Sequence, residues 1–133
     1  MAVDEETTDL TDGEVRAIHR VELGIEWLHR AHGSLLEFHH NTGHAMEHFA
    51  DAEALLREHG HEDLADEIRD QYLPRGVVDG GRWSYDVVES FQEDMLEDLT
   101  AFEKRTRQEV ADGRRHVAER SQEREWKRRA QRD

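Results

Sequence analysis

The stretch from residue 11 to residue 59 limits the fold more than any other part of this chain, because its apolar residues repeat at heptad spacing. A 3-4 spacing sustained over this length predicts one long amphipathic helix that packs along a seam against another long helix. Thr11 followed by Glu14 has the pattern of a capping box, which predicts that the helix begins there. The two heptad positions of the seam hold Ile18, Ile25, His32, His39, Met46 and Glu53, and Val21, Leu28, Leu35, Thr42, Phe49 and Leu56.

Two features of this stretch go beyond a plain helical seam. It contains three glycines, each of which costs about 0.5–1 kcal/mol relative to alanine in a helix interior. They predict close approach of a neighbour or a bend, and a break near Gly43 is the main alternative to one continuous helix. Trp27, Phe38 and Phe49 flank the seam, so the apolar arc is wider than one partner helix requires. This excess predicts a further layer or a second subunit.

The remainder of the chain reads as two more helices joined by turns. Gly60 stands where the first helix is expected to stop, and a short helix is predicted from about Glu62 to Leu73, ended by Pro74. Residues 74–76 and 79–81 read as turns. A third helix is predicted from Ser84, which we expect to be its N-cap. Its apolar stripe comprises Val88, Phe91, Met95, Leu99, Phe102, Thr106, Val110, Gly113 and Val117.

These patterns predict an all-α fold in which two long antiparallel helices form a hairpin with a short helix at the junction. The wide apolar arc predicts that two hairpins complete a four-helix-type bundle as a homodimer. We expect residues 1–10 to be a mobile acidic N-terminus and residues 11–113 to form the hairpin domain. Residues 114–133 are predicted to be a charged helical C-terminal extension.

The distribution of charge also favours a hairpin. Residues 114–133 contain eight basic and four acidic residues, whereas the start of the chain is acidic. If the third helix returns antiparallel to the first, these two charged ends meet. With the turn centred between Gly60 and Ser84, the predicted register places Met46 near Met95, His39 near Glu103 and Thr106, and His32 near Glu109.

The composition is strongly acidic, with a formal net charge of −14, and lysine occurs only as Lys104 and Lys127. Arginine in place of lysine among many carboxylates is typical of proteins from salt-loving organisms, where a Debye length of about 3 Å in molar salt screens the repulsion. Over the stretch from Ile25 to Phe91, the chain resembles an uncharacterised family of small acidic helical proteins from extreme halophiles. That resemblance implies no activity.

Several classes of protein are disfavoured by what the sequence lacks. There is no cysteine, which excludes a disulfide framework and a thiolate metal site. No apolar run approaches the roughly 20 residues that a membrane span requires. The first residues are acidic, unlike a secretion signal. We therefore expect a soluble cytoplasmic protein that does not act at a membrane.

Ten histidines make divalent-metal binding the chemistry to consider. In the predicted register, His32 and His39 would lie with Glu103 and Glu109 and could hold a metal ion, or could form hydrogen-bonded pairs that only determine the register. The second candidate ligands are His29, His40, His44 and His48, which include two E-x-x-H pairs on the first helix. Di-iron bundles place such pairs on two facing helices. Here both pairs lie on one helix, so a solvated polar face is the favoured interpretation.

No catalytic residue is predicted, because the chain contains no phosphate-binding loop, nucleophile elbow, dinucleotide fingerprint or H-E-x-x-H motif. The basic C-terminal segment could contact nucleic acid, but Glu119, Glu123 and Glu125 interrupt it, and the acidic body opposes such binding. The leading hypothesis is therefore a non-enzymatic helical interaction or structural module of a halophile cytoplasm with an unknown protein partner. The alternative is a His/Glu metal-binding helical bundle, of divalent-metal or di-iron type.

Overall fold

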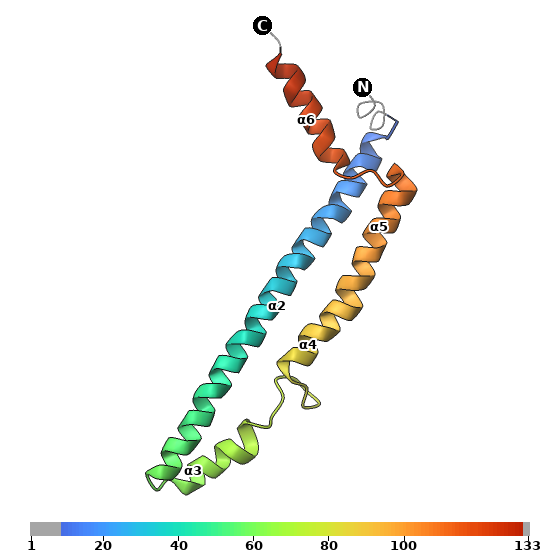
Figure 1. Ribbon diagram of the computed structural model, residues 1–133. Coiled ribbons are helices and arrows are strands. Elements are labelled where there is room, and N and C mark those ends of the chain that lie inside the picture. Colours follow the sequence, from blue (N-terminus) through green and yellow to red (C-terminus); the bar gives the residue numbers. More distant parts are fainter. Residues whose placement is uncertain (1–8, 132–133) are drawn as a thin grey trace. The chain divides into compact units, whose positions relative to one another are not determined.

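The computed structural model describes residues 9–131, and it confirms the predicted all-α class (Figure 1). Extended pairing within residues 9–131 is limited to one isolated bridge, between Val78 and Arg82. No helix in these residues has the length and apolarity needed to cross a membrane. Most of the predicted mobile segment 1–10 lies outside the described residues. The helical elements are α2 (Asp12–Glu58), α3 (Glu62–Glu67) continued by η1 (Ile68–Tyr72), α4 (Ser84–Ser90) continued by η2 (Phe91–Leu96) and α5 (Glu97–Ala111), and α6 (Val117–Ala130).

Both ends of α2 are determined by local hydrogen bonds that the sequence predicted. The capping box is complete, since the Thr11 N–H donates to Glu14 Oε1 over 2.9 Å and the Glu14 N–H donates to Thr11 Oγ1 over 3.1 Å. At the other end, Gly60 adopts a φ of +85°, which glycine reaches without steric cost. The His61 N–H then donates to the Leu56 carbonyl over 2.8 Å, and the Gly60 N–H donates to the Arg57 carbonyl over 3.3 Å. This pair of bonds is a Schellman motif, which stops the helix.

α2 runs without interruption through its three glycines, so the predicted continuous helix is confirmed and the alternative of a break near Gly43 is wrong. A Cβ at Gly24, Gly33 or Gly43 would meet no atom within 4 Å, so none of residues 9–131 approaches the helix closely there. The predicted seam is confirmed, because every residue at its two heptad positions is buried or half-buried except Phe49, which is 51% exposed.

The segment α3–η1 is the first part of the returning arm, and it is tied to the end of α2 by one arginine. Arg57 forms ion pairs of 3.0 Å with Glu53 on its own helix and with Glu62 and Asp66 on α3. These carboxylates raise the pKa of Arg57. The chain therefore reverses at Gly60, and α3 begins the returning arm of the central unit.

A compact loop joins η1 to α4. The Val77 N–H donates to the Arg82 carbonyl over 2.7 Å, and Gly80 and Gly81 turn the chain with positive φ. A Cβ at Gly76 would lie 2.1 Å from a backbone atom of Gly81, so only glycine fits at this crossing.

The third predicted helix differs from the structure at both ends. Ser84 is the first residue of α4 rather than its N-cap, so that prediction is wrong; the N-cap is Trp83. The predicted continuous stripe is interrupted after Ala111, where Asp112 and Gly113 adopt positive φ. His116, also at positive φ, precedes α6.

The chain divides into two compact units: the terminal unit, whose described residues are 9–29 and 96–131, and the central unit, Arg30–Met95. In the terminal unit, Ile18, Ala111 and Val117 form a buried cluster. In the central unit, the buried residues are Ala65, Ser84 and Val88. The domain division predicted at residue 113 followed composition rather than contacts, and it stays a prediction.

Candidate functional site

His39, the first of the two seam histidines, lies half-buried in the central unit with a polar partner. Its Nδ1 and the Ser84 Oγ are 2.7 Å apart, and Ser84 is only 7% exposed. The hydroxyl is held at the first turn of α4, where a serine side chain is close to the neighbouring helix. A buried polar group costs free energy unless it is hydrogen-bonded, so this pair satisfies both members.

His32 has a different set of neighbours in the same unit. The Gln92 side-chain nitrogen lies 2.7 Å from its Nε2, and because an amide nitrogen only donates, the imidazole accepts there. Its ring is stacked on Phe91, with ring centroids 6.2 Å apart and an interplanar angle of 11°. Residues 84–92 are therefore opposite residues 32–39, and the predicted register, which used residues 103–109, is wrong.

The two carboxylates of the predicted metal set belong to the terminal unit. Glu103 is half-buried and accepts a 3.2 Å hydrogen bond from Arg107 Nε, one turn further along α5. Glu109 is exposed. The structure thus gives His32, His39 and Glu103 other polar partners, and a metal site of His32, His39, Glu103 and Glu109 stays a prediction.

The second candidate ligands, His29, His40, His44 and His48, are all exposed. His44 Nδ1 lies 3.3 Å from Glu47 Oε1, but both side chains are 75% exposed. This is the solvated polar face of α2 that the spacing favoured. Among the contacts described for residues 9–131, the one that brings an E-x-x-H pair to another candidate ligand joins His40 to its sequence neighbour His39, with ring centroids 5.5 Å apart.

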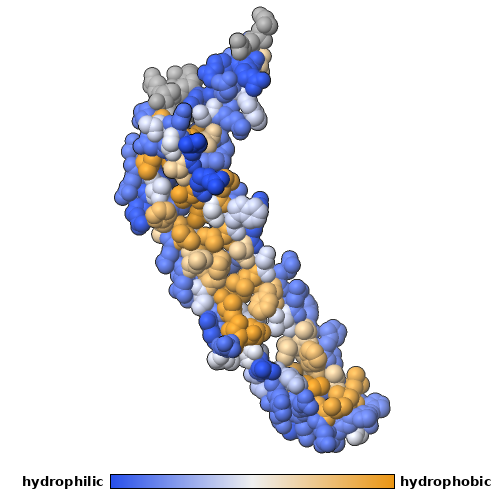
Figure 2. Space-filling view, turned by 180° about the vertical axis from the view of Figure 1, so that it is seen from behind, coloured by the Kyte–Doolittle hydropathy of each residue, from blue (hydrophilic) through white to orange (hydrophobic). Residues whose placement is uncertain are grey.

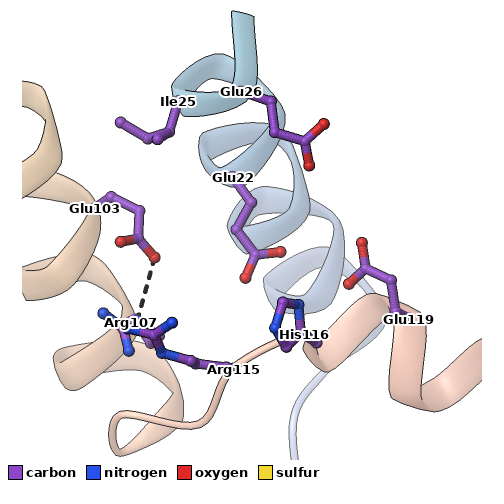
Figure 3. A pocket seen from close by; sticks show the side chains of 8 residues that line it. All are labelled: Glu22, Ile25, Glu26, Glu103, Arg107, Arg115, His116 and Glu119. Carbon is purple, nitrogen blue, oxygen red and sulfur yellow. Dashed lines mark hydrogen bonds and ion pairs between the residues drawn. The ribbon is translucent and has the colours of Figure 1, made fainter. Parts of the chain in front are cut away.

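A polar cavity of about 150 Å³ lies in the terminal unit (Figure 3). Its walls come from segments far apart in the sequence. α2 forms one side and α5 another, and residues 112–116 connect α5 to α6. In Figure 3 the Glu22 and Glu119 side chains extend from α2 and α6 into the space around His116. The lining residues are Glu22, Ile25, Glu26, Glu103, Arg107, Arg115, His116 and Glu119.

Glu22 lines this cavity and has a shifted pKa. Burial raises its pKa above the ordinary value, and the negative charge of Glu119 raises it further. The His116 backbone N–H and imidazole act in the opposite direction but do not cancel the shift. Glu22 Oε1 is buried and has no hydrogen-bond partner. The site therefore holds a carboxylate whose charge is incompletely compensated.

His19 completes a group of three metal-ligating side chains with Glu22 and Glu119. One ligand atom from each lies within 4.8 Å of the others. His19 Nδ1 is 3.5 Å from Glu119 Oε2, and this nitrogen is buried without a hydrogen bond. Sequence reasoning missed this group. His19 and Glu22 are an i,i+3 pair whose shared face was readable, but nothing in the sequence indicated that Glu119 would join them.

α6 contains most of the basic C-terminal segment, whereas Arg114 and Arg115 precede the helix and Arg132 lies outside the described residues. Lys127 Nζ is 2.6 Å from Glu123, which lowers the pKa of that carboxyl, and Arg128 pairs with Glu125. Intrahelical pairs thus occupy part of the positive charge, while Trp126 remains 60% exposed. The predicted meeting of the two charged ends is supported by one ion pair, Arg114 Nη1 to Asp9 Oδ1 at 3.2 Å.

Comparisons with protein-family models, with curated proteins and with solved structures found no match for this chain. The resemblance to halophile proteins stays a prediction.

Proposed function

We propose that this protein is a non-enzymatic helical interaction module, an antiparallel hairpin that pairs with a second copy of itself into a four-helix-type bundle. The observation that carries the proposal is the number of large hydrophobic side chains exposed in the central unit. A soluble chain does not usually leave many such side chains in contact with water in one region unless another surface covers them.

Ten of the fourteen large hydrophobic side chains found exposed among residues 9–131 belong to the central unit. The same unit buries only two apolar residues, the small Ala65 and Val88. Large apolar side chains of this unit are therefore mostly exposed to solvent rather than buried in a core. The ten exposed residues are Phe38, Phe49, Leu55, Leu64, Tyr72, Val77, Val78, Trp83, Tyr85 and Met95.

Part of this surface is concave. Met46 and Phe49 of α2, with Tyr72 and Val77 of the returning arm, line an open cavity of about 340 Å³ in the central unit. Figure 2 shows hydrophobic side chains gathered, among hydrophilic ones, at the end of the molecule that holds α3. A concave apolar surface suits an inserted side chain, which is how interfaces between helical proteins are usually anchored.

A second copy is the occupant that the charges favour. The central unit has five basic and fifteen acidic residues, a formal charge of −10, whereas residues 114–133 carry about +4. Within one polypeptide there is thus an acidic apolar surface and a basic helix with the exposed Trp126. Two copies could match these surfaces reciprocally, and closed pairs of this kind are the commonest oligomers.

The order of contacts along the chain supports the hairpin part of the proposal. Arg57 pairs with Asp66, His39 with Ser84 and His32 with Gln92 in the central unit. Ile18 packs with Ala111 in the terminal unit. From the first of these pairs to the last, the residue number on α2 falls while the residue number of its partner rises, which is the order expected of two antiparallel arms.

Sedimentation equilibrium over a range of concentrations, in dilute buffer and in molar salt, tests the proposal. We expect a dimer that persists in molar salt, where charge repulsion is screened and the hydrophobic effect acts. Phe49→Glu should weaken the dimer at least about tenfold, or about 1.4 kcal/mol. Asn41→Glu places the same charge at an exposed polar position of the same helix and should leave the dimer unchanged. A monomer under all conditions would overturn the proposal.

A further inference from the structure

We infer that His19, Glu22 and Glu119 form a site for a divalent cation, with zinc as the best match. This site lies in the terminal unit, apart from the apolar surface of the central unit, and it shares no residue with the ligands predicted from the sequence. Imidazole nitrogen and carboxylate oxygen are both protein ligands of Zn²⁺, and water can take an open fourth position.

The backbone holds the three side chains on a rigid base. His19 follows Ile18, and Glu119 comes two residues after Val117, so both sides of the group are attached to the buried cluster of Ile18, Ala111 and Val117. Glu22 is one turn beyond His19 on α2, which brings the two side chains to one face. A site built on helices anchored in a core needs little rearrangement to bind an ion.

Two of the three side chains also have a buried atom without a hydrogen bond. His19 Nδ1 and Glu22 Oε1 are buried without hydrogen-bond partners. Buried polar atoms are normally paired, because an unpaired one forfeits its hydration without compensation. One candidate ligand atom from each of His19, Glu22 and Glu119 lies within 4.8 Å of the other two, so a single cation can contact all three side chains.

The charges around the group favour a cation as well. The negative charge of Glu119 raises the electrostatic cost of ionising Glu22, as the raised pKa of the Glu22 carboxyl indicates. Of the two arginines that line the cavity, Arg107 and Arg115, the first is already paired with Glu103 at 3.2 Å. A bound divalent ion would neutralise two carboxylates at once and connect α2 to α6.

The chain offers a matched control for this site. His44 and Glu47 have the same i,i+3 spacing on the same helix and lie 3.3 Å apart, but both are 75% exposed and no third metal-ligating side chain joins them among residues 9–131. If zinc binding required only a helical His–Glu pair, this pair would bind equally well. If it requires the three-residue group, His44→Gln will have no effect.

Isothermal titration of the full chain with Zn²⁺, followed by thermal unfolding with and without the ion, tests the inference. We expect one saturable zinc site per chain and a rise in Tm on binding. His19→Gln, Glu22→Gln and Glu119→Gln should each weaken zinc binding by more than the roughly 10–100-fold typical of losing a supporting residue. Mg²⁺, which prefers oxygen ligands, should bind far more weakly.

Glu22→Gln also has a signature that no loss of folding can imitate. It removes the uncompensated carboxylate while keeping its shape, so the zinc-free variant should unfold at a higher temperature than the zinc-free parent, although its zinc response is lost. Absence of binding heat would overturn the inference. So would a zinc site that survives His19→Gln and Glu22→Gln but disappears in His44→Gln or in the double variant His32→Ala/His39→Ala.

Discussion

The terminal and central units use the same helix, α2, in opposite ways. In the terminal unit the seam position Ile18 is 2% exposed and packs against aliphatic side chains, and the polar groups gather in a cavity beside it. In the central unit the equivalent positions are His32 and His39, which bind Gln92 and Ser84, and large apolar side chains lie outside. The difference shows that one heptad pattern can support either an aliphatic or a polar contact. Which of the two forms depends on the side chains that the returning arm places opposite α2.

The largest expected effect concerns the aliphatic contact. Ile18→Ala should destabilise the protein by about 2–5 kcal/mol, because it removes buried methyl groups and leaves a cavity in a very small cluster. Met46→Ala, at the same heptad position in the central unit, should cost about 1 kcal/mol or less because Met46 is only half-buried. Urea unfolding at low protein concentration measures both. Equal losses would show that the two units do not differ in this respect.

A medium effect is expected at the polar contact. Ser84→Ala should cost about 1–2 kcal/mol, since it leaves the half-buried His39 without its partner. A double-mutant cycle with His39→Ala should show a coupling free energy of about 1 kcal/mol. Ser34→Ala changes an exposed serine on α2 and serves as the control. If the cycle gives no coupling, the polar layer does not stabilise the central unit.

The smallest effect is expected at the open glycines. Gly24→Ala in the terminal unit and Gly43→Ala in the central unit should each stabilise α2 by about 0.5–1 kcal/mol, because a Cβ meets nothing within 4 Å at either position. Thermal unfolding of the monomeric and associated protein measures this. A Gly43→Ala variant that folds better but associates less would place the second copy close to that part of α2.

Local signals explain what was predictable. The Thr11–Glu14 capping box and the stop at Gly60 depend on residues within about one turn of each other, and both were confirmed. The register was wrong because the turn was centred between Gly60 and Ser84, whereas the chain already reverses at Gly60. The continuous third helix was wrong because Asp112 and His116, which are not glycines, adopt the left-handed conformation.

The sequence by itself determined that this protein is helical, where α2 starts and stops, and which face of it is turned inward. Those properties follow from side chains and backbone groups only a few residues apart, whose interactions are the same in any surroundings. Only the tertiary structure decided that His19 and Glu22 meet Glu119, and that His39 meets Ser84. Such pairs join segments 45 or more residues apart, so they depend on how the arms pack and on where the chain turns.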